Sequence, residues 1–330
     1  MAEAYPKILE SDDGWLLEPG ELRRLAREPW VVCEKVHGAN LSFVVQPSGI
    51  TLHKRKGPVA RGEDFFGAAR VLARHESGLD ALATRALAEH GGREVQLFGE
   101  LYGGRYPHPD VPPVEGVQPI QTGIHYCPGV AFVAFDLALL EAEGARFVGY
   151  DRLRALCASC GIPVVQPLAR GSLSQALAFP LGFDSTFPAL HGLPRLAGPN
   201  PAEGVVVRPA AEVLVPTAKG PRRALLKRKL AAFAEDARYH QAQRWPASAG
   251  GDPLVVAERE GLVRINPNRI QAAVSKLGPR AEVGSEALAA EVLDDVWEEL
   301  REGAFVARLS RDERALLRAV LVEAAQALVG

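Results

Sequence analysis

Residues 34–40 read Glu-Lys-Val-His-Gly-Ala-Asn and follow the apolar run Trp-Val-Val-Cys at residues 30–33. Large apolar and β-branched residues in such a run predict a buried strand. Gly38, two residues before Asn40, permits the tight turn that would end it. The pattern therefore places Lys35 at the end of a strand, beside a turn, where its ammonium can be held against an incoming phosphate. Taken alone, an exposed lysine in a hairpin turn is the simpler interpretation.

Lysine is rare in this chain. Of the 38 cationic residues only 8 are lysine, and 6 of these fall in the stretches CEKVHGAN, HKRKGP and AKGPRRALLKRK. A lysine ammonium can lose its proton and become a nucleophile, whereas a guanidinium stays protonated. The clustering is therefore a weak indication of lysine chemistry.

Three further motifs place charge at the ends of predicted strands. Residues 98–100, Phe-Gly-Glu, end one strand with a carboxylate, and residues 203–208, Glu-Gly-Val-Val-Val-Arg, begin another with one. In residues 225–229, Leu-Leu-Lys-Arg-Lys, side chains two positions apart share a face of a strand, so Lys227 and Lys229 project together. Two ammoniums on one face, with no acid in the surrounding stretch, predict a cradle for a polyphosphate.

Length and composition exclude several classes of protein. A chain of 330 residues with 47% apolar and 24% charged residues predicts a globular protein of about two domains. No apolar run of about 18 residues occurs, so we expect no membrane span, and the first residues lack the pattern of a secretory signal. Four cysteines are too few for a disulfide scaffold, so a cytoplasmic location is expected. The net charge of −2 means that any surface that binds nucleic acid must be local.

A domain break is expected at residues 246–252, where small residues and glycines are typical of a linker. It separates a domain at residues 1–245 from a small all-α domain at residues 253–330. Asn266 and Ser310 are each placed to cap a helix of the second domain.

The sequence of the first domain predicts an α+β fold with largely antiparallel sheets. Its strand-like segments do not alternate regularly with helices, which argues against a doubly wound parallel sheet. Strands are predicted at residues 30–34, 41–46, 94–98, 130–137, 204–208 and 224–229. Helices are predicted at residues 64–75, 78–90, 151–160 and 172–178, and at 285–302 in the second domain. The proline-rich segment 105–128 is expected to form a long, ordered loop.

The motifs K-x-H-G, F-G-E, F-D, E-G-x-V and L-K-x-K follow one another along the chain. In this order they resemble the motifs of the covalent nucleotidyltransferases, the superfamily of DNA ligases, RNA ligases and mRNA capping enzymes. His37, in place of the more usual aspartate, makes the chain similar to the RNA ligase 2 family of ATP-dependent RNA ligases. The resemblance covers residues from 5 to about 233. It implies a nucleotidyltransferase (ATP-grasp-like ligase) fold, and residues 266–270 look like part of that family's own C-terminal domain, expected to dock RNA.

The resemblance also implies a three-step reaction that joins the 3′-hydroxyl and 5′-phosphate ends of RNA, in a nicked duplex or an RNA–DNA hybrid. Lys35 attacks the α-phosphorus of ATP and expels pyrophosphate, AMP passes to the 5′-phosphate, and the 3′-hydroxyl then displaces AMP. An ordinary lysine has a pKa of about 10.4, so few such amines are neutral at pH 7. We therefore expect Lys227, Lys229 and a metal ion to lower the pKa of Lys35.

The remaining roles follow the family motif by motif. His37 would serve the phosphate steps, and Glu203 would bind or orient Mg²⁺ or Mn²⁺. The residues expected to bind the nucleotide are Glu34, Lys35, Asn40, Arg55, Glu100, Phe135, Asp136, Arg208, Lys227 and Lys229. Among them, Glu100 would bind the ribose hydroxyls, Phe135 would stack on adenine, and Arg208 departs from the lysine that the family usually carries. The expected partner is RNA, in RNA repair, with a monomer as the expected oligomeric state.

Three alternatives remain. DNA-nick ligases and capping-type guanylyltransferases share these motifs but normally append an all-β OB-fold, against which a helical C-terminal domain argues. A catalytically inactive RNA-binding relative is disfavoured because the candidate nucleophile, carboxylates and paired lysines are all kept. Cys157-x-x-Cys160, with His125 and Cys127 upstream, could be drawn as a zinc site, but their helical spacing favours buried thiols.

Overall fold

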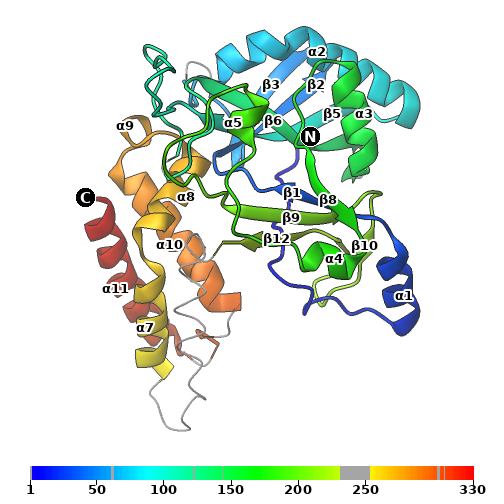
Figure 1. Ribbon diagram of the computed structural model, residues 1–330. Helices are drawn as coiled ribbons and strands as arrows, with labels where there is room; N and C mark the ends of the chain where they lie inside the picture. Colours follow the sequence, from blue (N-terminus) through cyan, green and yellow to red (C-terminus); the bar gives the residue numbers. More distant parts are fainter. Residues whose placement is uncertain are drawn as a thin grey trace. The chain divides into compact units, whose positions relative to one another are not determined.

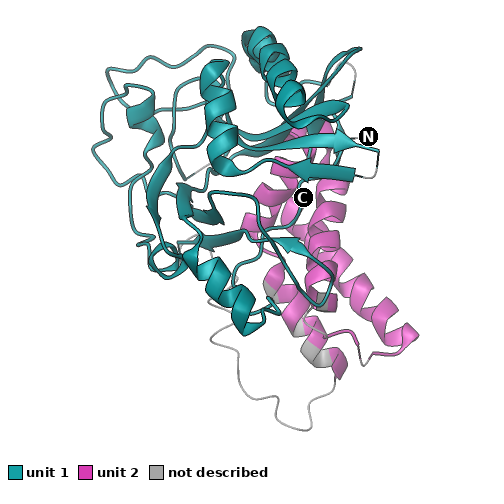
Figure 2. Ribbon diagram, turned by 90° about the vertical axis from the view of Figure 1, so that its right-hand side faces the viewer, with its two compact units in different colours: residues 1–230 teal, residues 231–330 magenta. Residues whose placement is uncertain are grey.

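The computed structural model describes residues 2–60, 63–121, 123–142, 144–230, 253–302, 305–307 and 309–330. The chain divides into two compact units, residues 1–230 and residues 231–330 (Figure 2). The predicted linker at residues 246–252 lies outside the described residues, as does the stretch 231–245 that was assigned to the first domain. The first unit is α+β and the described part of the second is helical, as the sequence predicts.

A six-stranded antiparallel sheet forms one half of the first unit (Figure 1). Its strand order is β4-β3-β2-β5-β6-β7. Helix α2 lies between β4 and β5 in the sequence, and a long segment, residues 104–129, joins β5 to β6. The strands are β2 (Ala39–Gln46), β3 (Gly49–Lys54), β4 (Gly57–Pro58), β5 (Glu94–Gly103), β6 (Val130–Glu141) and β7 (Gly144–Phe147). The strands β3, β4 and β7 were not predicted; β4 and β7 are short edge strands, which carry little apolar alternation.

One helix, α2 (Ala68–His90), packs on this sheet, beside α3 (Tyr150–Ser159). The prediction of two helices broken before Gly78 is wrong, since α2 runs through this position. A Cβ atom at Gly78 would lie 2.6 Å from the carbonyl oxygen of Cys160. The glycine therefore permits close approach of the two helices and does not end one.

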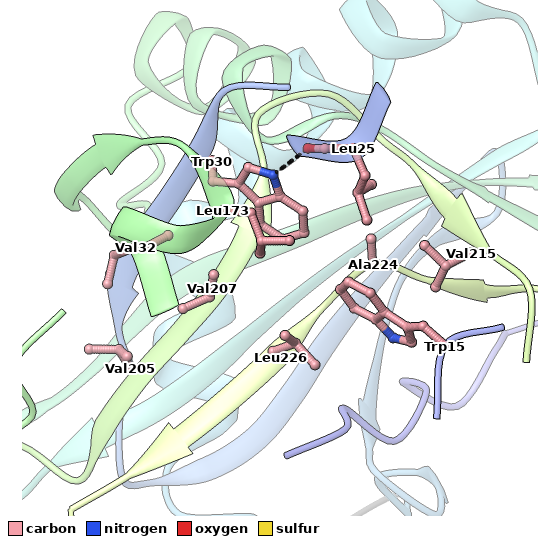
Figure 3. Close-up of a cluster of buried hydrophobic side chains, with 11 residues drawn as sticks. Trp15, Leu25, Trp30, Val32, Leu173, Val205, Val207, Val215, Ala224 and Leu226 are labelled. Atoms are coloured by element: carbon pink, nitrogen blue, oxygen red, sulfur yellow. Dashed lines mark hydrogen bonds between the residues drawn. The ribbon is translucent and has the colours of Figure 1, made fainter. Parts of the chain in front are cut away.

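A four-stranded antiparallel sheet forms the other half, in the order β12-β9-β1-β8. Its strands are β1 (Trp30–Glu34), β8 (Pro167–Gly171), β9 (Gly204–Pro209) and β12 (Leu226–Lys229). One face carries a buried apolar cluster that includes Trp30, Val205 and Leu226, shown in Figure 3. Helices α1 (Pro19–Arg27) and α4 (Leu173–Leu177) contribute to this cluster, and the Trp30 indole donates a 2.9 Å hydrogen bond to the carbonyl of Leu25.

A buried ion-pair network joins the two sheets. Asp136 of β6 is fully buried and accepts hydrogen bonds from Arg223 (2.6 Å), from Arg208 of β9 (3.2 Å) and from the Tyr5 hydroxyl (2.7 Å). Arg223 lies on β11 (Arg222–Arg223), which pairs with β10 (Leu214–Val215), and also binds Glu212. Because each buried charge has an opposite partner, the network can lie in the core.

The described part of the second unit is built from α7 (Pro253–Arg264), α8 (Pro267–Leu277), α9 (Arg280–Val283), α10 (Ser285–Glu302) and α11 (Arg311–Val329). The α10 prediction is confirmed at both ends. Both predicted caps are also confirmed: Asn266 accepts from the backbone of Arg269, and Ser310 forms a capping box with Glu313. In the described parts of the chain, no helix is both long and apolar enough to cross a bilayer.

Candidate active site

Three of the predicted site residues surround the buried carboxylate of a fourth, Glu203. The Glu203 side chain is 5% exposed, and its Oε2 accepts from Lys35 Nζ at 2.6 Å. His37 Nδ1 lies 3.4 Å from the same oxygen, and Lys229 Nζ lies 3.4 Å from Oε1. Residues 168 positions apart in the sequence thus form one cluster, which we call the Glu203 cluster: Lys35, His37, Glu203 and Lys229.

Strand register brings this cluster together. Lys35 follows β1, and its backbone N–H donates to the carbonyl of Gly204 at 2.9 Å, which extends the β1–β9 pairing by one residue. Lys229 stands opposite Gly204 on the other side of β9. Glu203, immediately before β9, therefore lies between two lysines from its two neighbouring strands.

The turn after Lys35 packs tightly on β5. A Cβ atom at Gly38 would lie 1.9 Å from the carbonyl oxygen of Leu101, so only glycine fits here. The backbone N–H of Gly38 donates to the Glu100 carboxylate, and Asn40 stands opposite Glu100 in the β2–β5 register. The structure thus brings Glu100 and Asn40, from the six-stranded sheet, beside the turn that follows Lys35.

The electrostatics of Lys35 correct one expectation. Burial by itself would lower the pKa of Lys35, but the carboxylates of Glu203 and Glu100 outweigh it and raise that pKa above its ordinary value. Without a metal ion, Lys227 and Lys229 therefore do not lower the pKa of Lys35 below its ordinary value, and the lowering expected with a bound ion stays a prediction. The reciprocal effect appears on Glu203, whose pKa the ammoniums of Lys35 and Lys229 and the hydrogen bond with His37 lower despite burial.

The pKa of Glu100 shifts upward, whereas that of Glu203 is lowered. Burial and the negative charge of Glu203 raise the pKa of Glu100 to about 8, although Lys35 acts in the other direction. Near neutral pH, its carboxyl is thus largely protonated and able to donate a hydrogen bond.

Two further predicted cations lie near the cluster. Lys227 shares the face of β12 with Lys229, and its Nζ lies 3.2 Å from Glu10. Burial and the charges of Lys229 and Lys35 lower the pKa of Lys227, against the effect of Glu10. Arg55 is exposed after β3, and its charge acts on both Lys35 and Glu100. The Glu203 cluster is therefore bordered by cations from both sheets.

Glu34 is held from a different direction. Its carboxylate is buried and accepts from the Ser185 hydroxyl at 2.6 Å, and from the Thr186 backbone and hydroxyl at 2.8 and 2.7 Å. Burial raises the Glu34 pKa, while these hydrogen bonds oppose the rise. The residue next to Lys35 is thus fixed to the segment that begins α5 (Phe187–Leu190).

A β-bulge directs the aromatic candidate. Phe98 pairs with Asp136 and Gly99 with Ala134, so Phe135 is the extra residue of β6. Such a bulge re-aims a side chain, and the ring of Phe135 is partly exposed, with its edge contact to Tyr5 at a centroid distance of 4.9 Å.

Asp136 and Arg208 do not join the Glu203 cluster. Both side chains are at most 5% exposed and bind each other within the network that joins the sheets, while Arg208 also donates to the Phe135 carbonyl at 2.9 Å. The expectation that these two side chains contact the nucleotide is therefore replaced by a structural role. Their charges compensate each other inside the core, where a bound phosphate could not reach them.

Several residues around the site had no signal in the sequence. Ser185, Thr186 and Glu10 contact site residues, and so do Tyr126 and Gln121, whose side chains bind the backbone of residues 37 and 38. All five come from segments without a motif, and their roles depend on long-range contacts. Only the proline-rich composition of 105–128, which predicts an ordered loop, pointed toward two of them.

The donor set fits a divalent ion that arrives with phosphates. Within the described residues, no group of three or more His, Cys, Asp or Glu side chains could hold a metal by itself. Cys157 is a buried thiol of α3, whereas Cys160 is the C-cap residue of that helix and is partly exposed. Mg²⁺ is commonly bound by one or two carboxylates together with substrate phosphates and water. Glu203, a hard oxygen donor with the ammoniums of Lys35 and Lys229 beside it, suits that arrangement.

Residues 28–229 match the family model described as RNA ligase, so the chain belongs to the RNA ligase family. The resemblance drawn from the motifs is thereby confirmed. RNA-editing ligase 1 of Trypanosoma brucei brucei, a mitochondrial protein, is 33% identical over 215 residues, which are 56% of this chain and 45% of that protein. RNA-editing ligase 2 of the same organism is 31% identical over 204 residues, 55% of this chain and 49% of that protein. The chain spans about half the length of these curated relatives.

Solved structures of RNA ligases are also similar. The Naegleria gruberi RNA ligase with pyrophosphate is 13% identical with a TM-score of 0.45, over 72% of this chain and 58% of that one. A variant of the same enzyme with ATP and Mn is 12% identical with a TM-score of 0.44, over 70% of this chain and 57% of that one. An archaeal ATP-dependent RNA ligase is 18% identical with a TM-score of 0.40, over 98% and 63%.

Proposed function

We propose that this chain is an ATP-dependent RNA ligase that joins 3′-hydroxyl and 5′-phosphate RNA ends through a lysyl-AMP at Lys35. Membership in the RNA ligase family supports the class of reaction. The observation that carries the assignment of the nucleophile is the Glu203 cluster, in which Lys35 meets a carboxylate and a second lysine at the junction of three strands.

The reaction begins when the Lys35 amine, having lost a proton, attacks the α-phosphorus of ATP. A P–N bond forms, the bond to pyrophosphate breaks, and AMP stays on the protein. The 5′-phosphate of one RNA strand then attacks the same phosphorus and frees the amine. Finally, the 3′-hydroxyl of the other strand attacks that activated 5′-phosphate, loses its proton and expels AMP. Dividing the reaction in this way replaces one difficult step by easier ones.

The main task of the side chains is to neutralise and position phosphate. Lys227, Lys229 and Arg55 supply cations near Lys35, and phosphoryl transfer depends chiefly on positioning and charge stabilisation. His37 lies within 3.4 Å of Glu203 and can act on the same phosphate steps.

Recognition of the nucleoside falls to residues of the six-stranded sheet. The protonated Glu100 carboxyl can hydrogen-bond a ribose hydroxyl, with Asn40 opposite it in the register. The partly exposed Phe135 ring offers a stacking surface for adenine. Glu34, fixed by Ser185 and Thr186, stabilises the strand end from which Lys35 projects.

Glu203 would hold the divalent ion, Mg²⁺ or Mn²⁺, with oxygens of the nucleotide phosphates completing its coordination. Such an ion supplies positive charge that offsets the carboxylate which otherwise raises the pKa of Lys35.

The helical second unit helps to distinguish an RNA ligase from a DNA-nick ligase or a guanylyltransferase. Its described residues form helices rather than the all-β module expected of a DNA-nick ligase or a guanylyltransferase. This favours the RNA-joining proposal, with nicked duplexes or RNA–DNA hybrids as substrates.

Incubation with radiolabelled ATP and Mg²⁺ tests the proposal. The wild-type protein should become labelled, Lys35→Ala should not, and Lys219→Ala, which changes an exposed lysine of the same unit, should label like the wild type. Persistent label on Lys35→Ala would refute the assigned nucleophile. Substitution of GTP, and nicked duplexes with RNA or DNA at the 3′-hydroxyl side, then separate the three enzyme classes.

A further inference from the structure

The nucleophile turn is held by a side chain from the proline-rich loop. The Tyr126 hydroxyl accepts a 2.8 Å hydrogen bond from the backbone N–H of His37, two residues after Lys35. Tyr126 is 2% exposed, so the acceptor side of this hydrogen bond is buried. In the same loop, Gln121 donates to the carbonyl of Gly38 at 3.1 Å, so the loop binds both the peptide group 36–37 and the peptide group 38–39.

Tyr126 is itself fixed on two sides. Its ring packs edge-on against Tyr102 and Phe187, with centroid distances of 5.3 and 5.5 Å. The backbone of the preceding residue, His125, is held at both its N–H and its carbonyl by the Asn200 side chain, at 2.8 and 2.7 Å. The position of the hydroxyl is therefore set by the core, and the turn must adapt to it.

The hydrogen bond between the His37 N–H and the Tyr126 hydroxyl affects the position of Lys35, whose Nζ is the reacting atom. The peptide that joins residues 36 and 37 can rotate only if its N–H leaves Tyr126, and such rotation would move the His37 ring, 3.4 Å from Glu203, together with the end of β1 that carries Lys35. Loss of the hydroxyl would also remove the acceptor that Tyr126 offers to this partly buried N–H, which favours a changed turn. In an active site, displacement by about 1 Å can cost a hundredfold in rate.

We propose that Tyr126 is a positioning residue for the nucleophile: its hydroxyl sets the conformation of the turn at residues 36–38 and thereby the rate at which Lys35 captures AMP. It does so without touching the nucleotide. This inference rests on the proposed ligase function, whose own failure would appear as absence of label on the wild-type protein.

The test compares Tyr126→Phe with Tyr102→Phe. Each variant deletes one buried hydroxyl from the same aromatic cluster, but the Tyr102 hydroxyl hydrogen-bonds with His191 at 2.9 Å and not with the turn. Transfer of radiolabelled AMP from ATP to the protein is followed in a single turnover over a range of ATP concentrations. It yields the rate constant, the half-saturating ATP concentration and the final labelled fraction. Hydrogen exchange of the peptide that contains residue 37 is measured by mass spectrometry.

Tyr126→Phe should lower the rate constant by about tenfold or more, with the half-saturating ATP concentration and the final labelled fraction unchanged. Exchange at the His37 amide should become faster. Tyr102→Phe should keep a wild-type rate constant. A rate constant for Tyr126→Phe within about twofold of the wild type, or a loss shared equally by Tyr102→Phe, would overturn the inference. A fall confined to the labelled fraction would indicate a merely structural role and would also overturn it.

Should Tyr126→Phe fail to fold, fluorinated tyrosine at position 126 gives a second route. Ring fluorination weakens the hydroxyl as an acceptor while it keeps the ring and the oxygen in place. The rate constant should then decline in step with the number of fluorine atoms, and an unchanged rate across the series would contradict the proposal.

Discussion

Replacing Asp136 by asparagine should destabilise the first unit by several kcal/mol, although the substitution removes one charge and hardly any volume. The Asp136 carboxylate is 0% exposed and accepts from Arg223 at 2.6 Å, from Arg208 at 3.2 Å and from Tyr5 at 2.7 Å. In the variant, the two guanidiniums would remain buried with a neutral amide between them. Glu212, bound to Arg223 at 2.6 Å, would be their remaining acidic partner in the network.

The magnitude follows from the geometry. Removal of one partner from a buried ion pair costs about 3–5 kcal/mol because a buried charge is left uncompensated. Since Glu212 still pairs with Arg223, we expect the lower end, about 3 kcal/mol. At about 2–4 °C per kcal/mol for a unit of this size, the melting temperature should fall by about 6–12 °C.

Differential scanning calorimetry and urea unfolding measure the change. The matched control is Asp151→Asn, which removes an exposed aspartate paired with Arg170 at the surface and should cost less than about 1 kcal/mol. Equal losses for the two variants, or a loss below about 1 kcal/mol for Asp136→Asn, would refute the reasoning on buried charge.

The pH dependence gives an independent check. Although burial opposes ionisation, Arg208 and Arg223 hold the pKa of Asp136 below its ordinary value. A carboxyl whose folded pKa is lowered stabilises the protein above its unfolded pKa, and that stabilisation is lost as the pH falls through the folded pKa. The difference in stability between wild type and Asp136→Asn should therefore be constant from about pH 5 upward and shrink below about pH 4.

Three further predictions concern the site and the second unit. Gly38→Ala should slow AMP capture by at least about tenfold, because the new Cβ would meet the Leu101 carbonyl at 1.9 Å, whereas Gly14→Ala, with no atom within 4 Å, should label normally. Glu100→Gln should slow AMP capture yet stabilise the fold at alkaline pH. The folded pKa of Glu100, about 8, lies above its unfolded value, so ionisation penalises the wild type as pH rises from about 4.5 to 8. Melting temperatures of the two proteins should agree below about pH 4.5 and diverge above it; a constant difference would contradict the raised pKa. Removal of residues 250–330 should spare self-adenylylation, measured as label on the protein, and impair sealing of nicked RNA; equal loss of both would argue against a docking role.

The sequence by itself determined the features that depend on local patterns. The strand at residues 30–34 and the helix at 285–302 have the predicted bounds, since apolar runs and caps act within a few residues. Alternation in residues 225–229 placed Lys227 and Lys229 on one face. The ordered motifs also identified the family.

The tertiary structure alone decided the electrostatics of the site and what holds it in place. Sequence reasoning expected a lowered pKa for Lys35, but the pairing of β1 with β9 brings Glu203 to within 2.6 Å and raises it. Asp136 belongs to a family motif, yet its carboxylate forms ion pairs with Arg208 and Arg223. Tyr126, which binds the turn after Lys35, lies in a loop without any motif. Coulomb and hydrogen-bond energies depend on distances between atoms far apart in the chain, and those distances exist only once the strands have paired.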